Sequence, residues 1–394
     1  MRLFFTTTVL CGAILFTPGA SPDRAQSTPA KAKKAITFRK HVLTNDFVSE
    51  GVAVADVNND GRPDVLAGAF WWEAPAWTQH SLLPPKTFAV KSYSNSFLNY
   101  TLDVNQDGWV DYIIIDYPGK AAHWYENPKN AVGYWKEHLI YPAVGNESPG
   151  FADIDGDGRP DLLCNDPINK RNIWVRPPDK DDTAWTAYTI SSDTLQSTHQ
   201  FTHGLGCGDV NGDGRVDVLV HEGWWEAPEN PRQPGWKFHK TAIGDDCAQM
   251  YVLDLNKDGN ADIISSSAHN YGIWWFEQQK TAKEIRFIKH ALFPRLFSES
   301  HNLYMADING DGYPDLITGK RHYAHNGGDP GAEEPSVLYW IECIPGKAPR
   351  FTPHLIDSAS GAGLHLVVTD INKDGRPDII TGNKNGVFIF EQLK

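Results

Sequence analysis

Cysteine and positive charge are both scarce in this sequence of 394 residues. Five cysteines are too few for a disulfide-rich scaffold, and their spacing matches no metal-binding or disulfide framework. Lys and Arg number 36 against 49 Asp and Glu, a net charge of −13, which excludes the basic surface of a nucleic-acid-binding protein. No apolar run reaches the ~18 residues of a transmembrane helix. The nucleophile elbow, the phosphate-binding loop and the HExxH motif are missing as well.

The N-terminus has the pattern of a targeting segment. After Met1 and Arg2, an apolar run extends over residues 3–16, and small residues follow at Gly19 and Ala20. We therefore predict a signal peptide over residues 1–25, a solvated tether over 26–35 and a secreted or periplasmic protein, with cleavage between Ala20 and Ala25. Four cysteines remain after processing, and we expect them to be buried small hydrophobic residues, with one disulfide as the alternative: Cys164, Cys207, Cys247 and Cys343.

One nine-residue pattern, D-x-[ND]-x-D-G-x-x-D, occurs seven times. The first aspartates of successive copies are 47, 50, 56, 45, 53 and 63 residues apart, a period typical of a solenoid or a propeller. The residues that the pattern predicts as metal ligands are Asp56, Asn58, Asp60, Asp64, Asp103, Asn105, Asp107, Asp111, Asp153, Asp155, Asp157, Asp161, Asp209, Asn211, Asp213, Asp217, Asp254, Asn256, Asp258, Asp262, Asp307, Asn309, Asp311, Asp315, Asp370, Asn372, Asp374 and Asp378.

The spacing of the pattern suits calcium. Side-chain oxygens at positions 1, 3, 5 and 9 can point inward if the chain curls tightly, and the glycine at position 6 permits the sharp turn. Hard oxygen donors of this kind are the ligands that Ca²⁺ prefers. We expect up to seven structural Ca²⁺ ions, and the alternative is seven Asx-turns without metal.

The segments around each loop have the composition of short β-strands, four in each repeat. A strand leads into the loop, a second leaves it, a third is aromatic (Trp224-Trp225-Glu226 is one example) and a fourth follows. The last repeat ends after its third strand, whereas a spare strand of the fourth type occupies residues 36–43. We therefore predict an all-β fold over residues 36–394, a seven-bladed β-propeller of four-stranded blades, with the ring closed by the N-terminal strand.

Histidines separate into two groups along this predicted topology. Six occur in the fourth strand or its N-terminal counterpart, where recurrence indicates a structural role. The other nine occur in or beside connections on the face opposite the loops: His123, His199, His203, His221, His269, His301, His322, His325 and His365. His203, His269 and His301 come from successive blades, so a shared catalytic divalent metal is one interpretation. Separate satisfied surface or core histidines are the other.

Further polar residues belong to the same predicted face, including four carboxylates in the connections between repeats: Glu50, Glu147, Asp246 and Glu299. We expect Tyr93, Glu222, Gln249, His301 and Lys384 to bind substrate, because such a ring suits a polyhydroxylated or anionic ligand. The longest connection, residues 319–336, is rich in glycine and is predicted to fold over the axis as a lid.

The repeats resemble the FG-GAP/VCBS repeat family, which also supplies the propellers of integrin α-chains. Four segments more closely resemble the propeller domain of aldos-2-ulose dehydratase, an enzyme that carries a metal and removes water from keto-sugars: residues 201–228, 265–278, 316–331 and 381–392. That resemblance implies catalytic roles for His203, His269, Lys320, Arg321 and His322. The dehydratases also contain cupin domains, which have no counterpart in these 394 residues.

Two functions follow as hypotheses. The first is a secreted lyase or dehydratase that performs β-elimination on a keto-sugar or glycoside. A histidine or lysine would be the base, a metal or Arg321 would stabilise the enolate, and His322 or Tyr323 would be the acid. The second is a non-catalytic module that binds a glycan or a protein, as integrin-like propellers do. A hydrolase of another kind is a further alternative. A carbohydrate ligand is expected, whereas nucleic acid and a membrane span are not.

Overall fold

A computed structural model describes residues 35–180, 182–244 and 246–394. The chain divides into two compact units, Met1–Ala35 and Ile36–Lys394, and the description below concerns the second. The predicted signal peptide lies outside the described residues, as does the predicted tether apart from Ala35. Among the described residues, no helix has the length and apolar character needed to cross a membrane.

The described residues form 27 β-strands and a single-turn 3-10 helix, η1 (His325–Gly327). In chain order the strands are β1 (Phe38–Thr44), β2 (Ala53–Ala55), β3 (Asp64–Ala67), β4 (Phe70–Glu73), β5 (Thr78–Ser81), β6 (Leu98–Leu102), β7 (Asp111–Ile115), β8 (Lys120–Glu126), β9 (Lys136–Ala152), β10 (Asp161–Asp166), β11 (Arg171–Arg176), β12 (Thr186–Ser191), β13 (Leu205–Gly208), β14 (Asp217–Val220), β15 (Gly223–Glu226), β16 (Lys237–Lys240), β17 (Gln249–Leu253), β18 (Asp262–Ser266), β19 (Ile273–Lys280), β20 (Ile285–Ala291), β21 (Leu303–Ala306), β22 (Asp315–Gly319), β23 (Leu338–Ile344), β24 (Arg350–Asp357), β25 (Leu366–Thr369), β26 (Asp378–Asn383) and β27 (Gly386–Gln392). The predicted all-β class is therefore confirmed.

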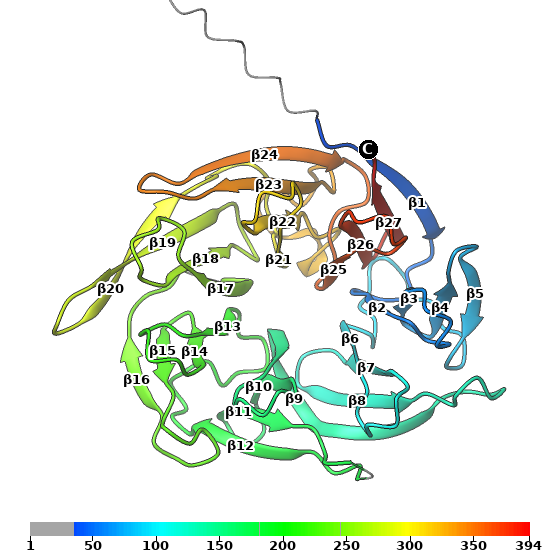
Figure 1. Ribbon diagram of the computed structural model, residues 1–394, viewed down its shortest axis with the longest axis horizontal. Coiled ribbons are helices and arrows are strands. Elements are labelled where there is room, and N and C mark those ends of the chain that lie inside the picture. Colours follow the sequence, from blue (N-terminus) through cyan, green and yellow to red (C-terminus); the bar gives the residue numbers. More distant parts are fainter. Residues whose placement is uncertain (1–34, 181, 245) are drawn as a thin grey trace, which may run out of the picture. The chain divides into compact units, whose positions relative to one another are not determined.

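These strands pair into five sheets, which follow one another in chain order around a common centre (Figure 1). Three sheets have four strands, in the orders β1-β27-β26-β25, β2-β3-β4-β5 and β21-β22-β23-β24. The other two have seven strands, β12-β11-β10-β9-β8-β7-β6, and eight strands, β16-β15-β14-β13-β17-β18-β19-β20. The sequence predicted seven separate sheets, so the structure differs at two junctions.

Two strand pairings account for the larger sheets. Strand β9 pairs with β8 through its first half and with β10 through its second half. Its pairing with β8 is irregular between Leu139 and Val144, and this irregularity bends the strand instead of ending it. Strands β13 and β17 pair in parallel, with Leu205 opposite Gln249. The expected pairing of the N-terminal strand with the last strand is present, since β1 lies antiparallel to β27 with Phe38 opposite Gln392.

The hydrophobic core lies between neighbouring sheets. One buried cluster joins Val65 and Trp72 of the β2–β5 sheet to Ile380 and Ile389 of the sheet that contains β1. Similar clusters fill the other junctions between sheets, and two further clusters lie within the seven-stranded and the eight-stranded sheet. Buried tryptophans occur in many of them. Packing between adjacent groups of strands thus stabilises the fold, as in other repeat architectures.

A tryptophan, a histidine and a glutamate recur together on the outer strands. His239 of β16 stacks on Trp224 with ring centroids 4.1 Å apart, and its Nε2 lies 2.7 Å from a carboxylate oxygen of Glu226. The same stack and contact occur for His80, His138 and His290. These contacts account for the histidines of the predicted fourth strands as structural residues.

Candidate functional site

A cavity of about 400 Å³ gathers many of the polar residues that the sequence placed on one face. Its lining consists of Tyr93, Phe97, Tyr117, Glu147, Phe201, His203, Asp246, His269, Arg321, His325 and Asn326. Strand β13 shows where the cavity lies relative to the nine-residue loops. His203 lies two residues before β13, and Asp209 directly follows it, so cavity and loop are at opposite ends of this strand. The four residues of β13 thus separate the cavity residue His203 from the nine-residue loop that begins at Asp209.

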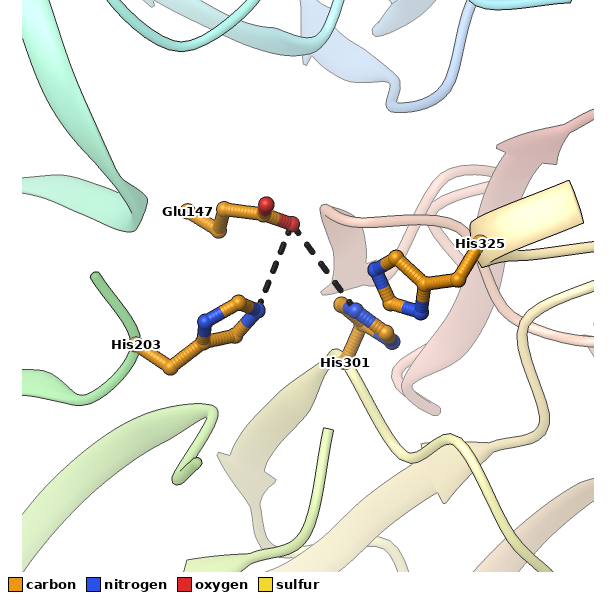
Figure 2. A group of neighbouring side chains, drawn as sticks. All are labelled: Glu147, His203, His301 and His325. Carbon is orange, nitrogen blue, oxygen red and sulfur yellow. Dashed lines mark ion pairs between the residues drawn. The ribbon is translucent and has the colours of Figure 1, made fainter. Parts of the chain in front are cut away.

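Three buried side chains meet beside the cavity, two of which, Glu147 and His203, line it, and the third is His301 (Figure 2). Nε2 of His203 lies 3.5 Å from Oε2 of Glu147, and Nε2 of His301 lies 3.8 Å from the same oxygen. All three side chains are less than a tenth exposed. Oε2 of Glu147 and the Nε2 atoms of His203 and His301 have no hydrogen-bond partner among the described residues. Buried polar atoms without partners are rare and costly, so this arrangement is that of a site for a bound group.

A second group of ligand-type side chains adjoins the first. The carboxylate of Asp329 lies 3.1 Å from Nδ1 of His269 and also contacts Nδ1 of His325. The ring of His325 is 4.0 Å from that of His269 and 5.0 Å from that of His301. Figure 2 shows His325 beside His301, and His325 belongs to η1 within the glycine-rich insertion. The insertion therefore supplies three polar side chains to the cavity lining, Arg321, His325 and Asn326, and places Asp329 beside them.

The charges around the cavity determine its protonation. Burial lowers the pKa of His301 well below its usual value, and the nearby Arg321 lowers it further. Burial and Arg321 likewise lower the pKa of His325 to about 4. Burial opposes ionisation of Glu147, but His203 and Arg321 outweigh it and hold the pKa of that carboxyl below its usual range. At neutral pH His301 and His325 are therefore neutral imidazoles and Glu147 is an ionised carboxylate, the forms that bind divalent metals.

Arg321 and Lys320 are both buried and ion-paired. Arg321 contacts the carboxylate of Glu50 and lies 3.8 Å from that of Glu147, so its charge reaches the cavity. Lys320 pairs with Glu299, and both side chains are almost fully buried. Arg321 lines the cavity, whereas Lys320 does not.

Lys384 lies close to the cavity without lining it. Its Nζ donates a hydrogen bond to the carbonyl oxygen of Tyr323 and lies 4.2 Å from the ring centre of Tyr93, which does line the cavity. Burial lowers the pKa of Lys384 to about 8. Its ammonium group therefore contacts the ring of Tyr93, which lines the cavity.

Three other residues predicted from sequence lie elsewhere. Glu222 accepts hydrogen bonds from the backbone and hydroxyl of Ser197. His322 contacts the hydroxyl of Ser336. Gln249 lines a separate cavity of about 380 Å³ among the inner strands, together with three tyrosines and His365. The structure thus brings together Tyr93, His203, His269, His301 and Arg321 of the predicted site residues, and leaves Lys320, His322, Glu222 and Gln249 outside the cavity.

The sequence analysis named no role for Asp329, which contacts two cavity histidines. Its only local signal is its place four residues after His325 in the glycine-rich insertion. Glu147 and Asp246, which the sequence analysis placed on the same face, also line the cavity.

The seven nine-residue loops adopt the expected tight curl. In the first loop, the carboxylate of Asp56 accepts hydrogen bonds from the backbone N–H groups of Asp60 and Gly61, and φ of Gly61 is +87°. Asp64, at position 9, is fully buried and accepts from Val57 and Ala74. The oxygens keep further lone pairs, so this donor set fits a hard cation such as Ca²⁺. The same hydrogen bonds also define Asx-turns, so both alternatives remain open.

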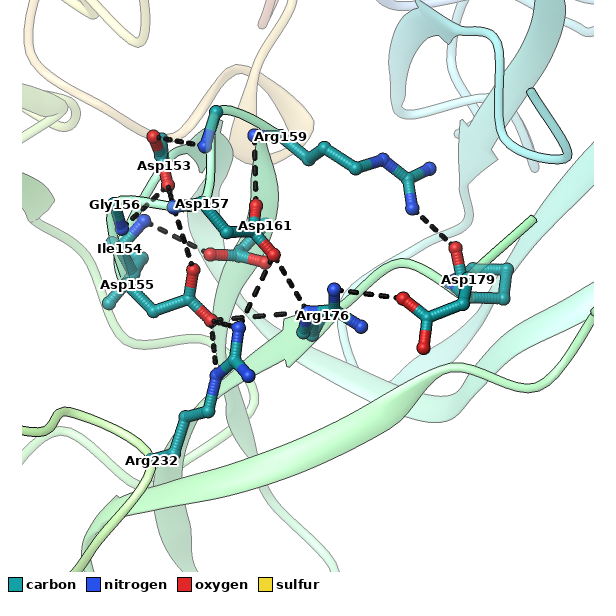
Figure 3. A network of polar contacts seen from close by, with 12 residues as sticks. Asp153, Ile154, Asp155, Gly156, Asp157, Arg159, Asp161, Arg176, Asp179 and Arg232 are labelled. Carbon is teal, nitrogen blue, oxygen red and sulfur yellow. Dashed lines mark hydrogen bonds and ion pairs between the residues drawn. The ribbon is translucent and has the colours of Figure 1, made fainter.

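The third loop differs from the others because it has an aspartate at position 3 (Figure 3). Oxygens of Asp153, Asp155 and Asp161 lie within 4.8 Å of one another. Arg232 donates to the carboxylate of Asp155 at 2.7 Å, and Arg176 donates to Asp157 at 2.8 Å. The two guanidinium groups offset the additional negative charge of this loop.

Comparison with known proteins identifies the repeats. A model of the FG-GAP-like repeat matches residues 103–164 and 244–318, so the chain contains FG-GAP-like repeats, as the sequence predicted. The comparison with curated proteins gave no significant match. The resemblance to the dehydratase stays a prediction.

Solved structures give similarities of fold only. The chain is 11% identical to the BBS1N protein, crystallised in complex with ARL6DN, with a TM-score of 0.51 over 91% of this chain and 96% of that one. The biofilm matrix protein Bap1 of V. cholerae is 11% identical, with a TM-score of 0.44 over 91% and 92% of the two chains. The rhamnogalacturonan lyase YesW is 13% identical, with a TM-score of 0.44 over 90% and 72%. The described residues thus have an all-β, propeller-like fold.

Proposed function

We propose that residues 36–394 form a closed propeller of seven four-stranded blades. Two pairs of blades would be fused, one through the shared strand β9 and one through the parallel pairing of β13 with β17. The pairing of β1 with β27 supports closure, because it joins the two ends of the unit in one sheet. Closure would remove the unpaired edges of an open array.

The proposed propeller is stabilised by calcium in its seven loops. The hard oxygen donors and the buried carboxylate at position 9 support this assignment. The predicted signal peptide supports a secreted or periplasmic location, where calcium is abundant enough to fill such loops. Calcium addition to the chelated protein should raise its melting temperature, and an unchanged melting temperature would favour metal-free Asx-turns.

The cavity is proposed to be the active site of a metal-assisted lyase or dehydratase that acts on a carbohydrate. The observation that carries this proposal is the convergence of unpartnered buried atoms from Glu147, His203 and His301 on one point. Imidazole and carboxylate are ligands for Zn²⁺, Mn²⁺ and similar ions. A divalent ion held there would supply Lewis-acid stabilisation of negative charge on a substrate oxygen.

The protein's own residues account for the other parts of a β-elimination. His269 has its Nδ1 oriented by Asp329, which leaves Nε2 available to remove a proton next to a carbonyl group. Arg321 brings a permanent positive charge to the cavity and would stabilise the enolate oxygen. The bond between the β-carbon and its oxygen would then break, and the proton held by His269 would pass to the leaving oxygen.

The aromatic side of the cavity supports a sugar as ligand. Tyr117 packs against Tyr93 at 5.3 Å and against Phe201 at 5.6 Å between ring centres, and all three rings line the cavity. Aromatic faces next to a few polar groups are typical of small-molecule sites. The same wall also favours the second candidate, a module that binds a glycan without reacting with it.

One experiment separates the two candidates. The purified protein is incubated with a panel of keto-sugars and uronate glycosides, and formation of unsaturated product is followed by ultraviolet absorbance. The lyase proposal expects new absorbance that is lost in His269→Ala. Saturable binding in calorimetry with no absorbance would establish the binding module instead, and absence of both would refute the carbohydrate site.

A further inference from the structure

A fourth potential metal ligand, His325, lies beside the three residues of the proposed metal site, Glu147, His203 and His301. Each of the four side chains offers one ligand atom, and these atoms all lie within 4.8 Å of one another. The ring centre of His325 is 5.0 Å from that of His301 and 6.4 Å from that of His203. In Figure 2 a ring nitrogen of His325 points toward Glu147. Three imidazoles and one carboxylate therefore face one point.

The contact of His325 with Asp329 leaves one ring nitrogen for a metal. Nδ1 of His325 contacts the carboxylate of Asp329, so Nε2 is the remaining ligand atom. The same carboxylate oxygen lies 3.1 Å from Nδ1 of His269, whose Nε2 stays available for the proton transfer proposed above. Histidines that bind metals almost always donate their other ring N–H to a carboxylate, a carbonyl or water, which fixes the ring. Asp329 has this relation to His325 and is a positioning residue for it.

We propose that one divalent transition-metal ion is bound by all four side chains, and that His325 couples this ion to the glycine-rich insertion. The inference rests on the proposed function, which places one metal in the cavity, and it adds a fourth ligand and a consequence for the insertion. His325 belongs to η1 within residues 319–336, whereas the other three ligands belong to β9 and to the segments before β13 and β21. Metal binding and docking of the insertion over the cavity are then a single event.

The backbone around His325 supports this coupling. Tyr323, His325 and Asn326 have φ values of +48°, +45° and +58°. Residues other than glycine adopt this conformation uncommonly, and it persists only where the surrounding structure holds it. A metal bond to His325 would hold the strained turn at its centre.

Burial and charge around the site favour a bound cation. Oε2 of Glu147 and the Nε2 atoms of His203 and His301 are buried without hydrogen-bond partners among the described residues, so a cation would satisfy all three. Arg321 is the cation that faces the site, with Nη1 3.8 Å from Glu147. Its charge is offset by its contact with Glu50.

A competing group of ligands consists of His203, Asp246 and His269. Asp246 is exposed, and an ion in this group would leave the buried atoms of Glu147 and His301 unsatisfied. The four-residue site is therefore the better assignment, and substitution of Asp246 distinguishes the two.

The number of protein ligands indicates the class of ion. A tetrahedral Zn²⁺ with four protein ligands has no position left for a substrate, and catalytic zinc sites use three. A six-coordinate ion such as Mn²⁺ or Co²⁺ keeps two positions open when four side chains bind it. Imidazole and carboxylate donors both suit ions of this series. The Lewis-acid role proposed above therefore requires a six-coordinate ion.

The first test measures the Co²⁺ affinity of the purified protein. The protein is stripped with chelator and returned to a large excess of Ca²⁺, so that calcium occupies the nine-residue loops, and Co²⁺ binding is followed by titration calorimetry. Wild type should bind one Co²⁺ per chain. Asp329→Ala should weaken binding about 10–100-fold, the usual effect of losing such a partner, and His325→Ala should weaken it further.

Hydrogen exchange gives a second measurement, which in the wild type needs no variant to fold. Co²⁺ should slow backbone exchange over residues 319–336 in the wild type but not in His325→Ala. The turn at residues 281–284, between β19 and β20 in the outer part of its sheet, is the internal control and should exchange equally with and without Co²⁺.

A matched control for the affinities is His221→Ala, which removes a histidine outside the ligand group and should bind Co²⁺ as the wild type does. Wild-type affinity in His325→Ala would overturn the proposal, as would exchange of the insertion that Co²⁺ does not change. A loss of affinity in Asp246→Asn as large as that in His325→Ala would favour the competing group and overturn it as well.

These outcomes are separate from those of the lyase experiment. Unsaturated product together with wild-type Co²⁺ affinity in His325→Ala would refute the fourth ligand and leave the lyase standing. Coupling of Co²⁺ to the insertion without any unsaturated product would establish the metal site and refute the lyase.

Discussion

The fourth nine-residue loop offers a direct test of calcium binding through Asp217→Asn. Asp217 is fully buried and accepts backbone hydrogen bonds from Val210 and Ala227, both at 2.9 Å. An amide can accept only one of these bonds, and its NH₂ group then faces a backbone N–H. In chelator the substitution should therefore cost about 1–3 kcal/mol of unfolding free energy, the usual cost of a buried unsatisfied polar group.

Calcium should enlarge that cost. A bound ion stabilises the folded state by about 2.7 kcal/mol when its free concentration is 100 times the dissociation constant. A variant that has lost the site forfeits this term, so the total destabilisation in calcium should be about 4–6 kcal/mol.

The assay is urea denaturation of wild type and variant, each in chelator and in saturating calcium. Asp193→Asn is the matched control, because Asp193 is exposed and lies outside the loops, and it should change stability by less than about 0.5 kcal/mol in either condition. An equal cost of Asp217→Asn in chelator and in calcium would refute calcium binding at this loop and leave only the Asx-turn.

Three further predictions concern individual polar side chains and their partners. Burial and neighbouring aspartates raise the pKa of Asp161 to about 7, so near pH 6 the folded state binds a proton that the unfolded state has released. The melting temperature in chelator should therefore fall as pH rises from about 5 to 8. A flat or rising profile would contradict this. His239→Ala should lose about 1–2 kcal/mol of stability, and a double-mutant cycle with Glu226→Gln should show coupling, whereas additive effects would show that their contact is not stabilising. Lys320→Met should cost about 3–5 kcal/mol by leaving Glu299 buried without its partner, and adding Glu299→Leu should recover most of it; no recovery would exclude the ion pair as the cause.

The sequence predicted the loops, strands and N-terminal pairing well because these depend on neighbouring residues. The glycine at position 6 and the aspartates around it specify the curl of each loop, and short apolar runs specify strands such as β3 and β7. The two fused sheets were not predictable, because the bend in β9 and the parallel contact between β13 and β17 depend on how whole sheets pack. Glu222 and Gln249 were likewise predicted to bind substrate from their place on one face, but the structure places neither in the cavity lining.

Sequence alone thus determined that the chain contains repeated acidic loops between short strands, with histidines gathered in connections at the other strand ends. Tertiary structure decided which of those histidines meet. Glu147 and His301 are separated by more than 150 residues, and Asp329 joins His269 only because the insertion folds back across a neighbouring sheet. Contacts of this kind arise from the packing of distant segments, which local propensity and spacing do not encode.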